Sequence, residues 1–273
     1  MSALEWWAEQ LRRWEIPAHV LAGASESPWV LPRSVFTRRA DAQIADPIGA
    51  SHFAQLAALG SPGTVLDIGA AAGASSLPLV GRAPVTEIIA VDTDAELLRA
   101  FAFRADALGA RTRRVHGAWP QVAWRIGVAD VVVAGNVVYN VADLGAFATS
   151  LSAHARRLVV VETSARHPLT ELNLLWRWFH GVARPEGPTA EDCVDALAEV
   201  GIRPWVSRWR RPAECEYASY AELVDVVRRR VCLPVRRSGE VAEALRELGV
   251  DQDCPPDLGS SGRDLVMLAW EPR

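Results

Sequence analysis

A segment rich in glycine and alanine follows an apolar run and carries an acid at a fixed distance. Residues 64–75 read TVLDIGAAAGAS, so Asp67 stands two positions before Gly69 and six before Gly73. A β-favouring apolar run before small residues predicts a buried strand, a tight turn and the start of a helix. Glycine permits close approach of a ligand, and the unpaired amides at a helix start favour a carboxylate or phosphate. We therefore expect this turn to hold a ligand.

A second acid stands where it would meet the same ligand. The apolar run 87–91 ends at Asp92, 19 residues after Gly73, and a helical pattern follows over 95–108. An acid about 20 residues beyond a glycine turn, at the tip of the neighbouring strand, is placed to bind ribose hydroxyls. Asp94 is expected to cap the helix that follows.

The spacing separates this turn from two common nucleotide-binding turns. The dinucleotide pattern G-x-G-x-x-G would fall on Gly69, Ala71 and Ala74, of which only the first is glycine. A P-loop fails because no Gly-Lys-Ser/Thr follows. The pattern Asp67-x-Gly69-x-x-x-Gly73 resembles motif I of the class I S-adenosylmethionine (SAM)-dependent methyltransferases, with Ala71 in place of their frequent middle glycine.

The resemblance implies SAM as the cofactor and S-adenosylhomocysteine as its product. Asp67 would lie near the ammonium group of SAM, and the small turn would leave room for its amino-acid tail. That family often has an acid at the position of Ala118, so Trp119 would offer the adenine a stacking face instead, and a structural Trp-Pro turn is the alternative. The cofactor-binding residues expected on this basis are Asp67, Gly69, Ala70, Ala71, Gly73, Asp92, Thr93, Ala118, Trp119 and Asn136.

Side chains for the reaction itself follow two later strands. A strand over 130–136 should end beside the glycine turn, which directs Asn136 and Tyr139 toward the expected region of methyl transfer. His167 and His180 lie in a long connection after the next strand, and histidine suits general-base work because its pKa lies near neutrality. The candidate catalytic residues are therefore His167, His180 and Tyr139, with a surface or capping role as the alternative for each histidine.

The residues give little support for a metal ion or a disulfide. The strand 157–162 ends in Glu162-Thr163, whereas a metal-dependent catechol-type mechanism would favour two acids or an acid and an asparagine. The four cysteines are widely spaced, with no C-x-x-C pair and no neighbouring histidine cluster, which argues against zinc and gives no disulfide framework. We expect no metal site and reduced cysteines, as in cytoplasmic proteins.

The order of the patterns predicts the architecture. We expect an α/β fold with a seven-stranded Rossmann-like methyltransferase sheet, mostly parallel with an antiparallel last strand, and helices on both faces. Residues 1–58 are expected to form an N-terminal helical or lid segment with a loop over 23–39, and residues 59–273 the methyltransferase domain with a helical insertion at about 215–250. The N-terminal loop, through Trp29 and Phe36, and the connection after the fifth strand would form the acceptor pocket.

The composition of the chain limits the classes of binding partner that we expect. The 273 residues carry a net charge of −4, which gives no general attraction to nucleic acid or anionic membranes. The N-terminus is not a signal peptide, and no run approaches the roughly 20 apolar residues of a membrane helix, so we expect a cytoplasmic protein. The first hypothesis is methyl transfer from SAM to a small molecule by direct displacement.

Two other functions stay open. Residues 203–237 hold nine arginines and four acids, with Trp205 and Trp209 between them, a pattern that would suit RNA methylation. The protein could instead use a SAM fold to bind the cofactor or a partner without catalysis, since Ala71 and Ala118 depart from the family pattern. The sequence does not indicate an oligomeric state.

Overall fold

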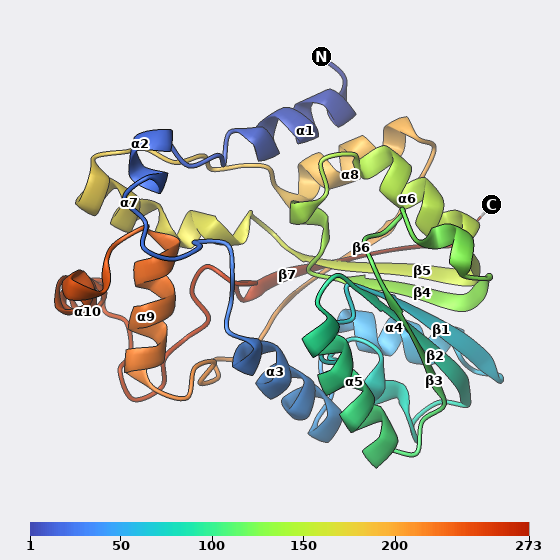
Figure 1. The fold of residues 1–273 in the computed structure, drawn as a ribbon. Helices are drawn as coiled ribbons and strands as arrows, with labels where there is room; N and C mark the ends of the chain where they lie inside the picture. The colour runs from blue at the N-terminus through green and yellow to red at the C-terminus, as the bar shows by residue number, and fades with distance from the viewer. Residues whose placement is uncertain (273) are drawn as a thin grey trace.

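The computed structural model describes residues 1–272, which fold around one seven-stranded sheet (Figure 1). The strand order is β3-β2-β1-β4-β5-β7-β6, and β7 runs antiparallel to both of its neighbours while the other pairs are parallel. This confirms the predicted fold class. The strands are β1 (Gly63–Ile68), β2 (Val85–Asp92), β3 (Thr112–His116), β4 (Ala129–Gly135), β5 (Ala155–Ser164), β6 (Trp205–Arg210) and β7 (Asp264–Trp270).

The central strands are buried because helices cover both faces of the sheet. Val131, Val132 and Val133 in β4 are almost completely inaccessible, as expected for a parallel strand with apolar residues on both sides. One face packs against α1 (Ala3–Arg12), α6 (Leu144–Ala153) and α8 (Ala190–Glu199), and the other against α4 (Ala50–Ala58) and α5 (Ala95–Ala107) (Figure 1).

A second apolar core lies beside the sheet, at the left of Figure 1. It joins α2 (Ala18–Leu21), α7 (Asn173–His180), α9 (Tyr220–Arg230) and α10 (Ser238–Glu247), which we call the helical cap. The cap therefore combines the N-terminal segment, the connection after β5 and the insertion before β7. Single 3₁₀ turns complete the chain at η1 (Leu77–Leu79), η2 (Ala123–Arg125), η3 (Val138–Asn140), η4 (Pro168–Leu172) and η5 (Val235–Arg237).

Two local expectations near the glycine turn are wrong. The loop predicted over 23–39 ends early, because α3 (Arg33–Ala45) begins directly after Pro32, its N-cap residue. The helix expected after the glycine turn is only the three-residue turn η1. Helices α3 and α4 both contact η1, so they occupy the face of the sheet that a longer helix would otherwise cover.

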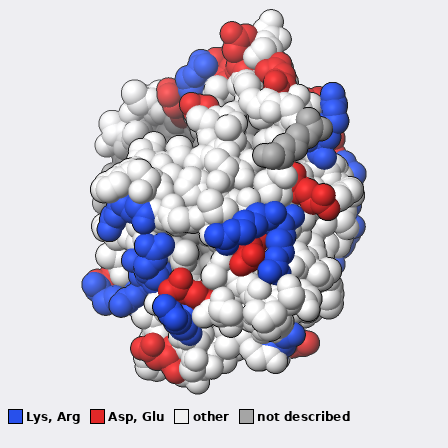
Figure 2. Space-filling view, turned by 90° about the vertical axis from the view of Figure 1, so that its right-hand side faces the viewer, with Lys and Arg blue, Asp and Glu red and all other residues white. Residues whose placement is uncertain are grey.

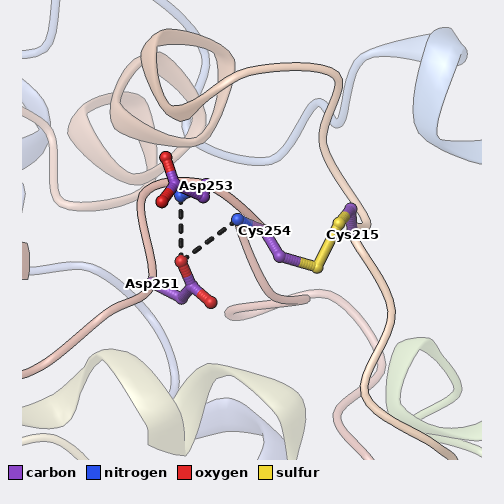
Figure 3. Close-up of a disulfide and its surroundings, with 4 residues drawn as sticks. All are labelled: Cys215, Asp251, Asp253 and Cys254. Atoms are coloured by element: carbon purple, nitrogen blue, oxygen red, sulfur yellow. Dashed lines mark hydrogen bonds between the residues drawn. A yellow bond between two sulfur atoms is a disulfide. The ribbon is translucent and has the colours of Figure 1, made fainter.

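The expectation of reduced cysteines is wrong for two of the four. Cys215 and Cys254 form a disulfide, although they lie 39 positions apart in the sequence (Figure 3). A turn brings Cys254 into place: one carboxylate oxygen of Asp251 accepts the backbone N–H groups of Asp253 and Cys254 at 2.9 and 3.1 Å. Spacing along the chain gave no sign of this contact. None of the helices within residues 1–272 has the length and apolar character needed to cross a bilayer.

Candidate active site at the carboxyl edge of the sheet

Asp67 lies at the end of β1 and is completely buried. Its Oδ2 accepts a hydrogen bond from the hydroxyl of Ser76 at 2.6 Å, while Oδ1 has no partner within residues 1–272. Burial raises the pKa of this carboxyl to about 7, against the opposing effect of the Ser76 hydrogen bond. The contact of Asp67 with the ammonium group of a ligand stays a prediction, since the side chain does not reach the surface but keeps Oδ1 without a partner in that part of the chain. Its visible role is to hold the far side of the glycine turn through Ser76.

The turn itself needs glycine mainly because of the protein's own packing. Gly69 and Gly73 have φ angles of +71° and +101°, in the region that disfavours side chains. A Cβ on Gly69 would lie 2.5 Å from Val137, and one on Gly73 would overlap Leu77. Ala71 occupies the same region, at φ +44°, even though it carries a Cβ.

Asp92 is held in one orientation by the two segments beside it. Its Oδ2 accepts the N–H of Ala71 and its Oδ1 the N–H of Asp94, each at 2.8 Å. A carboxylate offers about four lone-pair positions, so each oxygen keeps one for a further donor. Asp92 is only partly buried, and two fixed acceptors side by side match a pair of neighbouring hydroxyls. Asp94 caps α5 through the amides of Glu96 and Leu97, which confirms the predicted capping role.

The edge next to Asp92 contains two of the other predicted cofactor residues. Thr93 and Ala118 are exposed, and His116 donates to the carbonyl of Thr93 at 3.0 Å. Trp119 lies elsewhere: only 8% of it is exposed, and its ring meets that of His154 edge-on at 4.8 Å. The structure therefore gives Trp119 a core position, which favours the structural Trp-Pro turn over a stacking face for an adenine. Ala70 is buried inside the turn.

A cavity of about 550 Å³ opens beside the tip of β4, between the sheet edge and the helical cap. This tip lies next to β1, where the strand order reverses, which is the usual ligand position in open parallel sheets. Asn136 follows β4 with φ +56°, and its N–H donates to the carbonyl of Glu162 at 2.7 Å. The cavity wall includes Trp14, Trp29, Phe36, Asn136, Tyr139 and His167.

His167 lies between two aromatic rings in this wall, stacked on Trp14 and tilted against Tyr139. Its ring centroid lies 4.2 Å from that of Trp14 and 5.0 Å from that of Tyr139. Its Nδ1 accepts the N–H of Leu169 at 3.3 Å, and burial, together with Arg230 and Arg184, lowers its pKa to about 3. The ring is therefore neutral near pH 7, with its proton on Nε2. In this state Nε2 donates a hydrogen bond and has no lone pair for a general base.

The other two candidate catalytic side chains have structural partners. The hydroxyl of Tyr139 donates to the carbonyl of Ser164 at 2.9 Å, and burial raises the pKa of this phenol above its ordinary value. Tyr139 is thus a neutral phenol in the cavity wall. His180 lies at the end of α7 in the cap, outside the cavity wall, and its Nε2 donates to the carbonyl of Val231 at 2.7 Å. We propose no catalytic role for His180.

Sequence reasoning missed the polar residues that complete the cavity. Arg39, Arg230 and Ser260 all line it. Arg230 is the last of three consecutive arginines, and nothing in such a run distinguishes an inward from an outward side chain. No group of three or more His, Cys, Asp or Glu side chains within residues 1–272 is arranged to hold a metal ion.

Comparison with known proteins identifies the fold. No protein-family profile matches this sequence, and no curated protein matches it either. Among solved structures, a proposed sarcosine dimethylglycine methyltransferase from Galdieria sulphuraria is 13% identical and matches 96% of this chain and 97% of its own, with a TM-score of 0.51. The YcgJ protein from Bacillus subtilis is 17% identical over 80% of this chain and 96% of its own, with a TM-score of 0.50. At such identities the likeness concerns the fold alone: this chain has the Rossmann-like fold of the class I methyltransferases.

Proposed function

We propose that this protein transfers a methyl group from SAM to a small-molecule acceptor by direct displacement. The observation that carries the proposal is Asp92, a carboxylate fixed by two backbone amides at the carboxyl edge of the sheet, with an acceptor position left on each oxygen. It stands near the point of strand-order reversal, where a cavity of about 550 Å³ also opens. A ribose diol would meet Asp92, and the acceptor would occupy the cavity.

The residues of the chain would act by positioning. SAM supplies a methyl group on a sulfonium, which is already a good electrophile. Alignment of reacting groups can contribute roughly 7–11 kcal/mol to a rate, so a general base is not required. In this proposal Thr93 and Ala118 border the adenine, Asn136 separates the cofactor edge from the cavity, and the Nε2–H of His167 orients a polar atom of the acceptor.

The RNA alternative has no support from charge. Of the nine arginines in 203–237, six form ion pairs with acids: Arg208, Arg210, Arg211, Arg228, Arg229 and Arg237. The indole N–H of Trp209 donates to the half-buried Glu162, which fixes that side chain, while Trp205 is exposed. Figure 2 shows a different face, the one at the right of Figure 1 and away from the helical cap; there too arginines lie beside acids, with wide uncharged areas between them.

Calorimetric titration of the full chain with SAM, S-adenosylhomocysteine and NAD tests the proposal. We expect micromolar binding of the two sulfur ligands and none of NAD. Asp92→Ala should weaken SAM binding by at least about tenfold, because one hydrogen bond to a charged group contributes about 1.5–3 kcal/mol.

Asp130→Ala provides the matched control. Asp130 also accepts a backbone amide, that of Thr64 at 2.8 Å, but it lies at the opposite edge of the sheet. The Asp130→Ala variant should therefore bind SAM with the affinity of the wild type. Absence of SAM binding to the wild type would refute methyl transfer and leave a partner-binding protein with this fold. Equal affinities of the two variants would remove Asp92 from the cofactor site.

A further inference from the structure

Arg230 is an unpaired cation in the wall of the cavity. It ends α9 and lines the cavity, and its guanidinium forms no ion pair or hydrogen bond with any group in residues 1–272. Its Nε is buried without a partner in that part of the chain. The preceding residues differ, since Arg228 and Arg229 both pair with Asp225. The lack of an ion-pair partner for Arg230 is therefore not a general feature of the arginines on α9.

The nearby acids are already engaged. Asp257 attracts Arg230, but one of its oxygens lies 2.9 Å from both Arg39 and Arg211 and also accepts from Ser261. Glu216 is paired with Arg39. Leaving a half-buried charge without a counter-charge is unfavourable, and a ligand can supply the anion that Arg230 lacks.

Two further hydrogen-bond donors face the same space. The Ser260 hydroxyl lines the cavity and is buried without a partner among the described residues. His167 keeps its Nε2–H free, because Nδ1 accepts the amide of Leu169. The positive charges of Arg230 and Arg184 both act on His167, so this end of the cavity is electropositive. The three groups Arg230, Ser260 and His167 can all donate a hydrogen bond, and the ligand group complementary to them is an anionic acceptor.

The remaining wall indicates the body of the ligand. Trp14, Trp29, Phe36 and Tyr139 present aromatic rings around the cavity. Such rings favour contact with a flat apolar surface, and a guanidinium pairs with a carboxylate through two parallel hydrogen bonds. A planar molecule with one carboxylate would satisfy both parts of the wall.

We propose that Arg230, assisted by Ser260 and His167, binds the carboxylate of a ligand inside this cavity. If the proposed function holds, this ligand is the methyl acceptor, and the acceptor is then a flat aromatic or apolar carboxylate. That identification rests on the proposed function. The methionyl tail of SAM also ends in a carboxylate, so it is the second possible source of the same group.

The experiment compares 1-naphthoate with its neutral analogue 1-naphthamide by calorimetry on the full chain. The wild type should bind the carboxylate at least tenfold more tightly than the amide. Arg230→Gln should abolish that preference, Arg230→Lys should keep part of it, and Arg229→Gln, the matched charge loss on the same helix, should leave it intact. Removal of an unpaired charge should not lower the melting temperature of Arg230→Gln, which checks that the variant is folded.

Titration of the same variants with SAM distinguishes the two sources. Unchanged SAM affinity in Arg230→Gln, with the naphthoate preference lost, assigns the site to the acceptor. A tenfold loss of SAM affinity in Arg230→Gln but not in Arg229→Gln assigns it to the methionyl carboxylate. Equal binding of naphthoate and naphthamide, together with unchanged SAM affinity, overturns the carboxylate site. If no variant binds SAM while the naphthoate preference persists, the methyltransferase proposal fails and the carboxylate site stands.

Discussion

Ala71 adopts a backbone conformation that residues with a side chain seldom take. Its φ of +44° lies in the left-handed region, between Gly69 and Gly73, which lie in the same region. For an L-residue this region is less favourable by roughly 1–2 kcal/mol. What holds Ala71 there is its own N–H, which donates to Asp92 at 2.8 Å. The strain is thus tied to the interaction that orients the carboxylate.

Ala71→Gly should therefore stabilise the protein. Relief of the left-handed strain exceeds the added flexibility of glycine in the unfolded chain, so we expect a gain of roughly 0.5–1 kcal/mol. Urea unfolding measures it. Ala72→Gly is the control: Ala72 is buried beside Ala40 of α3 and does not have a positive φ, so its replacement by glycine should destabilise the protein. Equal destabilisation by both changes would show that Ala71 carries no strain.

Strand-tip residues can be located from sequence, but their environments cannot. Asp67 and Asp92 both follow apolar runs, and both were expected to contact the cofactor. The fold buries the first against Ser76 and leaves the second partly open. His167 and His180 likewise share one connection, yet only His167 lines the cavity. Tertiary packing distinguishes the two members of each pair, and the spacing of residues along one strand or helix does not report tertiary packing.

At the scale of elements, α3 shows how packing overrides a local pattern. Only Val35 and Ala40 of α3 are buried, so the helix lacks the broad apolar stripe that would predict it. Ala40 packs against Ala72 of the glycine turn and Leu97 of α5. By contrast, continuous apolar runs mark four of the strands, β1, β2, β4 and β5. This local pattern predicted their positions in the sequence correctly.

The disulfide constrains the insertion that carries α9 and α10. Cys215 and Cys254 flank these two helices, and their separation of 39 residues sets the loop that they close. Closing a loop of this length stabilises a fold by up to about 4 kcal/mol, because it limits the unfolded chain. Reduction with dithiothreitol should therefore lower the free energy of unfolding by an amount in this range.

Thiol counting in denaturant provides the direct check. Two thiols should react in the unreduced protein, those of the buried Cys193 and Cys232, and four after reduction. Cys215→Ser should reproduce the loss of stability and become insensitive to reductant. Four reactive thiols without reductant, in protein purified under air, would show that the bond does not form.

At the scale of the whole molecule, α3 connects the cap to the sheet. Val35 belongs to the apolar core of the cap, while Ala40, further along, packs on the glycine turn. The cap itself could not be predicted as a unit, since its helices come from three distant parts of the chain and each alone is short. The sheet could be predicted as a unit, because alternating strands and helices restrict a parallel fold to few arrangements.

Charge reinforces this connection at Arg39, which pairs with both Glu216 and Asp257. Arg39→Met would leave two largely buried carboxylates with less compensation, and we expect a loss of about 3–5 kcal/mol in urea unfolding at pH 7. Arg12→Met, which breaks an exposed pair with Glu9, should cost less than about 1 kcal/mol. Similar losses in the two variants would mean that the Arg39 network does not tie the cap to the sheet.

The dependence of this loss on pH gives the sharper test. Arg39 and Arg211 hold the pKa of Asp257 below its usual value, against the opposing effect of burial. A depressed pKa contributes stability above the pKa of the unfolded carboxyl, about 3.9, and that stability disappears as pH falls through the folded value. Arg39→Met raises the folded pKa, so the variant's deficit should be full at pH 7 and shrink toward pH 4, where protonation removes the uncompensated charge. A deficit of constant size between pH 7 and pH 4 would indicate lost packing of the arginine side chain, with no contribution from its charge.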